Sequence, residues 1–376
     1  MNARASLAQT RTLVVKLGTS VCLNAKGAPN GEVLLPLARE IVELRRGGVQ
    51  VVVVSSGAVG MGRALDLHGH IGNQNLAQKQ ALAALGQVEL MNVYRRIFEL
   101  LGVLVAQVLL TRRDLDSRER YLNARNTLLT LLRAEVLPVI NENDSVATDE
   151  IRFGDNDILA CLVGSVVEAD LVVNLTQTEG LLARQEDGGY RVVAQVEGVD
   201  EETFGLVEEG TSRGGTGGMR SKLLAAQAAA DYGGAMVIAR AHEPNVLQRL
   251  LAGEPLGTLF VPPPRRPRSR KRWLAAGAVC KGTLVVDAGA RKALVHGGRS
   301  LLPVGVKAIE GEFTVGDVVA IAALDGAPLG RGLTNYNSED LARIKGQPTQ
   351  EIEEILGFRG YDEVIHRDNL FIRKDG

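Results

Sequence analysis

Sequence features that would identify a disulfide-rich, zinc-binding or membrane protein are scarce in this chain of 376 residues. Its three cysteines, Cys22, Cys161 and Cys280, are isolated and odd in number, which argues against a disulfide framework and against a zinc site. No stretch approaches the roughly 18 apolar residues of a membrane span, and no apolar leader opens the chain. We therefore expect a cytoplasmic protein without a membrane partner.

Charge and aromatic content are also modest. The net charge of -1 gives the whole chain no electrostatic affinity for nucleic acid or an anionic membrane. Aromatic residues make up 4% of the chain, and there is one tryptophan. The 45% hydrophobic content is that of a globular protein and the length allows two domains, so a disordered or fibrous protein is excluded.

Four β-branched runs each end in a small or polar turn. They are TLVVKLGTS (12–20), VVVVSSGAVG (51–60), LPVINEND (137–144) and LVVNLTQTEG (171–180). Helical patterns separate these runs, and strand–helix–strand units are parallel and right-handed in nearly all cases. Because ligands bind at the carboxyl edge of such sheets, the sequence predicts an α/β, doubly wound, mainly parallel sheet over 1–260 with a ligand crevice at that edge.

The periodicity also predicts the individual elements of this domain. We expect a first helix in which Leu34, Leu37, Ala38, Ile41 and Leu44 recur at helical spacing before Gly47 and Gly48, and further helices over 75–101, 118–135, 157–168 and 219–232. Strands are expected over 49–54, 103–110, 137–141, 171–175 and 235–240.

A proline- and arginine-rich stretch at 261–274 separates two regions that differ in the length and spacing of their apolar runs. Proline favours extended backbone, so this stretch is predicted to be a linker. Residues 275–376 contain short apolar runs at close turn spacing, with helical stretches near 338–345 and 349–356. They predict a small β-barrel with helical additions.

Two lysines stand in glycine-containing turns that suit a phosphate. Lys16 ends the first strand, and Lys222 follows GGTGG at the start of a helix, where backbone N–H groups bind anions. Lys16 could instead extend from a strand end to water, but the second lysine favours phosphoryl transfer. No GxxxxGK[ST] motif occurs, and GAVGMG at 57–62 has the wrong spacing for a dinucleotide site.

Polar side chains gather in INEND (140–144) and GDND (154–157). Their oxygens could hold an ammonium group, orient the lysines or lie near Mg²⁺, although solvated loops are also rich in Asn and Asp. Ser56 precedes a glycine turn, but its surroundings are not GxSxG, so substrate hydrogen bonding is favoured over a nucleophilic role. The HxH of His68 and His70 is not expected to bind metal.

These motifs, with LLTRRDLDSRERYLNARNTL, SLLPVGVKAIEG, YNSEDLARIKG and VIHRDN, resemble those of the glutamate 5-kinases of the amino acid kinase family almost from end to end. The resemblance implies transfer of the γ-phosphoryl of ATP, with Mg²⁺, to the side-chain carboxylate of L-glutamate. The product, L-glutamyl 5-phosphate, begins proline synthesis. The resemblance also implies feedback inhibition by proline, a homo-oligomer (dimer or tetramer) and a C-terminal PUA domain.

The same resemblance implies roles for individual residues. Lys16 and Lys222 would contact the transferring phosphoryl and the nucleotide phosphates, and Asp157 would hold both lysines in place. The residues implied to bind glutamate are Ser56, Asp144 and Asn156. Those implied to lie at the nucleotide, besides the two lysines, are Thr176, Gln177, Thr216, Gly217, Gly218 and Met219. The family usually has Asp at position 177, so Gln177 alters hydrogen bonding on the nucleotide side; no residue is assigned to a metal.

Two alternatives stay open. The acceptor of the same fold could be another small acid, such as aspartate, acetylglutamate or carbamate. The chain could also be an RNA-binding sensor, because PUA folds are common in RNA-modifying enzymes. RNA binding needs a basic face or stacking aromatics, and we expect the arginine-rich run at 265–272 to be a solvated linker instead.

Overall fold

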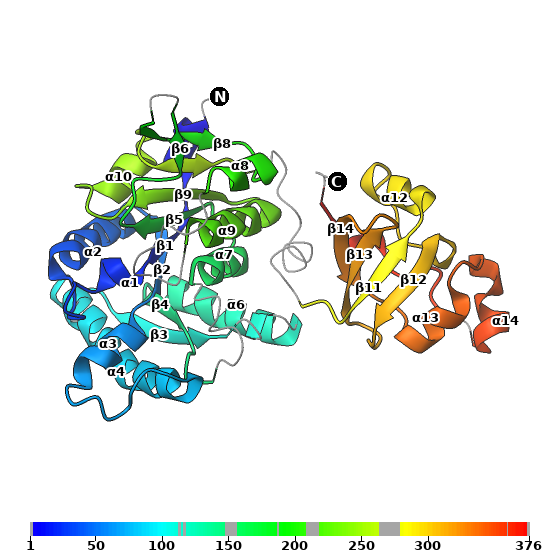
Figure 1. The fold of residues 1–376 in the computed structure, drawn as a ribbon, viewed down its shortest axis with the longest axis horizontal. Helices are drawn as coiled ribbons and strands as arrows, with labels where there is room; N and C mark the ends of the chain where they lie inside the picture. The colour runs from blue at the N-terminus through cyan, green and yellow to red at the C-terminus, as the bar shows by residue number, and fades with distance from the viewer. Residues whose placement is uncertain are drawn as a thin grey trace. The chain divides into compact units, whose positions relative to one another are not determined.

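The computed structural model describes residues 3–111, 114–115, 118–146, 156–185, 188–207, 218–262, 279–358 and 360–373. The chain divides into two compact units, Met1–Arg266 and Pro267–Gly376 (Figure 1). Within the described residues, no helix combines the length and apolar character that a membrane crossing requires.

An eight-stranded sheet organises the N-terminal unit, in the order β3-β4-β2-β1-β5-β9-β10-β8. Its strands are β1 (Thr12–Leu17), β2 (Gln50–Ser55), β3 (Val105–Leu110), β4 (Leu137–Glu142), β5 (Leu171–Thr176), β8 (Gln195–Val196), β9 (Ala235–Arg240) and β10 (Thr258–Phe260). The first six strands in this order are parallel, and β10 is antiparallel to β9. The predicted mainly parallel sheet is confirmed, and its carboxyl edge collects the turns after β1, β2, β4 and β5.

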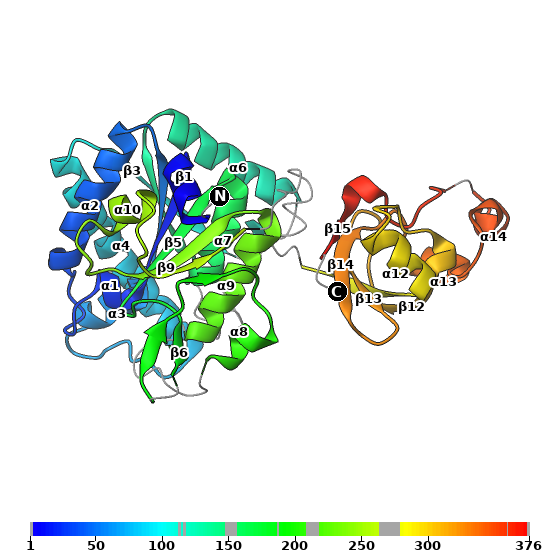
Figure 2. The ribbon, with the colours of Figure 1, turned by 90° about the horizontal axis from the view of Figure 1, so that it is seen from above.

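Helices cover both faces of this sheet (Figures 1 and 2). One face carries α2 (Gly31–Arg46), α3 (Ala58–Leu65), α4 (Leu76–Leu100) and α10 (Val246–Leu251), and the other carries α6 (Arg118–Arg133), α7 (Asn156–Val167) and α9 (Met219–Tyr232). Shorter elements are η1 (Ala3–Gln9), α1 (Thr19–Cys22), α8 (Glu201–Gly205) and the hairpin of β6 (Leu182–Arg184) and β7 (Tyr190–Val192). The long helices agree with the predicted ones, whereas these short elements, α3 and α10 were not predicted.

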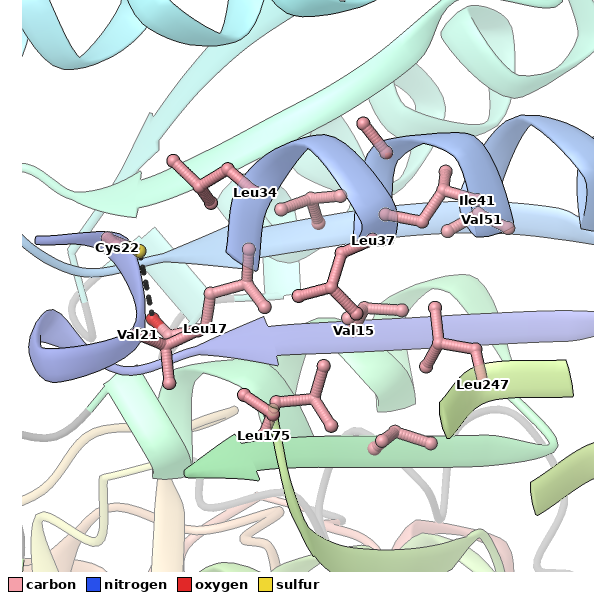
Figure 3. Close-up of a cluster of buried hydrophobic side chains, with 14 of the residues drawn as sticks. Val15, Leu17, Val21, Cys22, Leu34, Leu37, Ile41, Val51, Leu175 and Leu247 are labelled. Carbon is pink, nitrogen blue, oxygen red and sulfur yellow. Dashed lines mark hydrogen bonds between the residues drawn. The ribbon is translucent and has the colours of Figure 1, made fainter. Parts of the chain in front are cut away.

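The core between β1 and α2 decides which way the first lysine points. Val15 and Leu17 pack against Leu37 and other buried side chains of α2 (Figure 3). Side chains alternate across a strand, so Lys16, which lies between them, projects to the opposite face, toward α7 and α9.

Two glycines let α3 and α4 cross at very short range. A Cβ on Gly62 would lie 1.8 Å from the Leu82 carbonyl oxygen, and one on Gly86 would lie 1.9 Å from that of Ala58. Gly57, with φ of +114°, forms the turn that starts α3. The glycines of GAVGMG therefore serve a turn and a close helix contact, which explains their resemblance to a ligand loop.

A five-stranded sheet with its own apolar core forms the C-terminal unit, in the order β12-β11-β13-β14-β15. Its strands are β11 (Gly282–Val286), β12 (Val306–Gly311), β13 (Val318–Ala323), β14 (Pro328–Leu333) and β15 (Leu370–Ile372). The helices are α12 (Ala288–Val295), α13 (Ser338–Ile344) and α14 (Ile352–Leu356), with 3-10 turns η3 (Pro303–Gly305), η4 (Thr349–Glu351) and η5 (Arg367–Asn369). Strands with helical additions agree with the pattern read from the sequence.

Candidate active site

Asp157 lies between two lysines at the carboxyl edge of the sheet. Lys16, from β1, forms an ion pair with its Oδ1, and Lys222, from the first turn of α9, donates to its Oδ2 at 2.9 Å. All three residues are buried, with exposed fractions of 6% for Lys16, 2% for Asp157 and 7% for Lys222. The structure thus brings together the three residues that the sequence suggested for catalysis.

Two further side chains, which the sequence analysis missed, complete the surroundings of Asp157. Asn174 Nδ2 donates to Oδ1 at 3.0 Å, and Ser221 Oγ donates to Oδ2 at 3.3 Å. Asn174 is the register partner of Lys16 in the parallel pairing of β1 and β5. An asparagine inside an otherwise apolar strand was the signal that could have identified it.

The electrostatic balance of this centre favours an anion. Burial alone would raise the pKa of Asp157, but the charges and hydrogen bonds of Lys16 and Lys222 outweigh it and hold that pKa well below its usual range. Two ammonium groups then face one carboxylate, which leaves a buried net positive charge. A buried charge of this kind is costly without a partner, and a phosphate would supply one.

A second group of polar side chains lies where β2, β4 and α7 meet. Asn156 Nδ2 lies 2.9 Å from Ser56 Oγ, 3.0 Å from the Ser55 carbonyl oxygen and 3.0 Å from Asn141 Oδ1. Ser56 and Asn156, two of the three residues suggested for glutamate, are therefore hydrogen-bonded to each other. Ser56 acts here as an acceptor, which suits substrate positioning.

Asp144, the third suggested glutamate residue, lies in the turn after β4. Burial raises its pKa to about 6. Among the residues that the structure describes it forms no ion pair, and no hydrogen bond joins it to Ser56 or Asn156. It is an acidic group at the same sheet edge that has no cation from the described part of the protein.

The nucleotide-side residues are only partly described. Thr176 ends β5, and Gln177 Nε2 donates to the Ser20 carbonyl oxygen at 2.6 Å. Gly218 precedes α9, which begins at Met219 with no capping side chain among the described residues, and the N-terminus of a helix favours an anion such as phosphate. Thr216 and Gly217 lie outside the described residues.

Gln177 also borders an open cavity of about 730 Å³. The cavity is lined by side chains of α1, of the loop that follows it and of α3, including Lys26 and Arg63.

The remaining feature of the site is the set of metal ligands that the described residues could offer. No three His, Cys, Asp or Glu side chains among them gather closely enough to hold a metal ion. Asp157, the buried carboxylate of the centre, has both oxygens engaged by Lys16 and Lys222.

Comparisons with known proteins agree with this architecture. The model of the amino acid kinase family matches residues 11–240, and that of the PUA domain matches residues 282–356. A glutamate 5-kinase of Caldanaerobacter subterraneus subsp. tengcongensis is 46% identical over 366 residues, covering 97% of this chain and 98% of the relative. A glutamate 5-kinase of Herpetosiphon aurantiacus is 48% identical over 361 residues, covering 95% and 97%. With this similarity along nearly its whole length, the chain belongs to the amino acid kinase family and carries a C-terminal PUA domain.

Proposed function

We propose that this protein is a glutamate 5-kinase, which transfers the γ-phosphoryl of ATP to the side-chain carboxylate of L-glutamate and so begins proline synthesis. The observation that carries the proposal is the buried centre of Lys16, Asp157 and Lys222, whose charges sum to a net positive value at the carboxyl edge of the sheet. Near-full-length similarity to glutamate 5-kinases supports glutamate as the acceptor.

Lys16 and Lys222 stabilise the charge that spreads over the transferring phosphoryl group. Asp157 contacts both ammonium groups, so it keeps two like charges close together and fixes their positions. Glutamate needs no general base, because a side-chain carboxyl with a pKa of about 4.3 is already ionised at neutral pH. Catalysis then depends on positioning and charge stabilisation by the protein.

The acceptor amino acid lies at the other end of the site. The Asp144 carboxylate pairs with the α-ammonium group of the amino acid, and Ser56 and Asn156 form hydrogen bonds with the amino acid. Proline retains an ammonium and a carboxylate, so it competes for the same groups, and this is how we propose that it inhibits the enzyme.

ATP lies on the side of β5 and α9. Thr176, Gln177, Gly218 and Met219 border it in this proposal, together with Thr216 and Gly217. Mg²⁺ bound with the nucleotide would neutralise phosphate charge, since this ion commonly binds through substrate phosphates and few protein groups. By resemblance to its family we also propose that the enzyme is a homo-oligomer.

The test is an ATP- and Mg²⁺-dependent assay in which hydroxylamine traps the acyl phosphate as a hydroxamate. Glutamate, aspartate and N-acetylglutamate are compared under the same conditions. Glutamate-selective hydroxamate is expected. Selective product from another acid would keep phosphoryl transfer but overturn the acceptor, and no product from any acid with folded protein would overturn the kinase proposal.

A further inference from the structure

Three amide side chains form a continuous chain of hydrogen bonds from α4 to the acceptor end of the site. Asn156 Nδ2 donates to Asn141 Oδ1 at 3.0 Å, and Asn141 Nδ2 donates to Gln87 Oε1 at 2.7 Å. Gln87 follows Gly86, the residue at which α4 comes closest to α3. The close helix crossing thus helps to place an amide of α4 against the end of β4.

A backbone group and Gln87 favour the same orientation of the chain. Asn141 Oδ1 also accepts a hydrogen bond from the Glu142 N–H at 2.9 Å. Turning the Asn141 amide over would set its NH₂ group against that N–H and its oxygen against Gln87 Oε1, so both neighbours favour the observed orientation of this amide. Its NH₂ group then faces Gln87 Oε1, and Asn156 must present its NH₂ group to Asn141.

This orientation leaves one unpaired atom at each end of the chain. Gln87 Nε2 and Asn156 Oδ1 are buried and have no hydrogen-bond partner among the described residues. Leaving such a buried atom unpaired is unfavourable, so each end of the chain favours a ligand group that pairs with it. The three amides donate in the same direction and polarise one another, so the negative end of the chain is the oxygen of Asn156.

We propose that Gln87 is a positioning residue for the acceptor amino acid. By accepting from Asn141, it holds the Asn141 amide against Asn156. Together with the Ser55 carbonyl oxygen, which accepts from Asn156 Nδ2 at 3.0 Å, Gln87 keeps the Asn156 oxygen as an acceptor for the α-ammonium group of the substrate. The inference rests on the proposed function, because it takes the acceptor to be a free amino acid. Gln87 itself need not touch the substrate.

Two substitutions separate this role from a merely structural one. Gln87→Met keeps the length of the side chain but removes the acceptor, so the Asn141 amide loses its partner. Gln87→Glu keeps an oxygen that can accept from Asn141 Nδ2, replaces the unpaired NH₂ group by a second oxygen and introduces an ionisable carboxyl group. Gln87→Leu is a second variant without an acceptor and should behave as Gln87→Met does.

The measured quantities are kcat and the KM values for glutamate and ATP. In Gln87→Met we expect the glutamate KM to rise roughly tenfold, as for one lost hydrogen bond to a charged group, with kcat and the ATP KM within about twofold. Gln87→Glu should stay within about threefold of the unaltered enzyme. An unchanged glutamate KM in both Gln87→Met and Gln87→Leu, a loss confined to kcat, or failure of Gln87→Glu to restore the KM would overturn the proposal.

Glutarate, which is glutamate without its ammonium group, provides the matched ligand control. Its inhibition constant against glutamate should be the same within about twofold in the unaltered enzyme and in Gln87→Met. An equal penalty for glutarate and glutamate would mean that Gln87 does not act through the ammonium group. If the unaltered enzyme makes no glutamyl hydroxamate, the proposed function fails, which is a different result from normal activity that Gln87→Met leaves unchanged.

Discussion

Asp157 and Asp144 are two carboxylates at the same sheet edge in opposite surroundings. Asp157 contacts two lysines, an asparagine and a serine, and its pKa lies well below the usual range. Asp144 contacts no cation among the described residues, and burial raises its pKa to about 6. The first is satisfied within the protein, whereas the second is a carboxylate that a cationic group of a ligand would stabilise.

We propose that this difference separates two tasks within one site. The Asp157 end holds positive charge in place and suits the phosphoryl group that moves. The Asp144 end, with Ser56 and Asn156, offers acceptors and suits the amino acid that receives it. Substitutions at the first end should therefore lower kcat, and substitutions at the second should raise the glutamate KM.

The largest effect is expected for Lys222→Met, which keeps the side-chain length and removes the charge. We expect kcat to fall by roughly 100- to 1,000-fold, because transition-state charge loses one of its two lysines. The glutamate KM should stay within about threefold. The control is Lys345→Met, an exposed lysine of the C-terminal unit, which should leave kcat unchanged. A near-normal kcat in folded Lys222→Met protein would remove Lys222 from the mechanism.

Asp144→Asn should produce the next largest effect, and at the other end of the comparison. Loss of a charged partner for the ammonium group should raise the glutamate KM roughly 10- to 100-fold, with kcat within about threefold. Steady-state kinetics at saturating ATP measures both constants. A fall in kcat at constant glutamate KM would mean that Asp144 acts on the phosphoryl group, as Asp157 does, and would contradict the division of the site into two ends.

Lowering the pH should have a smaller effect on the glutamate KM. Because the pKa of Asp144 is raised to about 6, its carboxylate takes up a proton as the pH falls through that value and no longer attracts an ammonium group. The glutamate KM should therefore rise roughly fourfold at pH 5.5 relative to pH 7.5, at a nearly constant kcat. Asp144→Asn should abolish this dependence, and its persistence in that variant would assign it to another group.

The linked stability effects have opposite signs. Asp144 has a raised pKa in the folded state, so its ionised form is destabilising, and that cost disappears as the pH falls from above 6 toward its unfolded value. Asp157 has a lowered pKa, so the stability that it contributes is present above its unfolded pKa and is lost only in stronger acid, as the pH falls toward its folded value. Of these two carboxyl groups, Asp144 is the one that titrates near pH 6.

The smallest effect is expected for Gln177→Ala on the nucleotide side. Gln177 donates one exposed, neutral hydrogen bond to the Ser20 carbonyl oxygen, so its loss should raise the ATP KM by no more than about threefold and leave the glutamate KM unchanged. Gln177→Asp, which restores the residue usual in the family, serves as the second variant. A change confined to the glutamate KM would show that Gln177 belongs to the acceptor end.

Much of this arrangement could be predicted from local sequence. Strand ends were predictable because β-branched runs stop at glycine, serine or asparagine, and parallel pairing then brings those ends to one edge. Lys16 was identifiable because a lysine within an apolar run is costly unless it meets an anion. The residues of INEND and GDND suggested that an oxygen there could orient the lysines, and the family resemblance assigned that role to Asp157.

Contacts between distant segments could not be predicted in this way. The hydrogen bond between Gln87 and Asn141 joins α4 to the end of β4. The sequence around Gln87 does not distinguish this residue from an ordinary exposed glutamine of a helix. Helix α3 was missed because its glycines are typical of a turn, and only the crossing with α4 explains them. Asn174 was missed because its role depends on the register of β1 against β5.

The measurement that tests the division most directly is the ratio of kcat/KM for glutamate to kcat/KM for N-acetylglutamate, in the unaltered enzyme and in Asp144→Asn. The account predicts a large ratio in the unaltered enzyme, because the acetylated acid has no ammonium group for Asp144, and a ratio at least roughly tenfold smaller in Asp144→Asn, with kcat for glutamate preserved. An unchanged ratio, or a substitution that abolishes kcat for both acids, would contradict it.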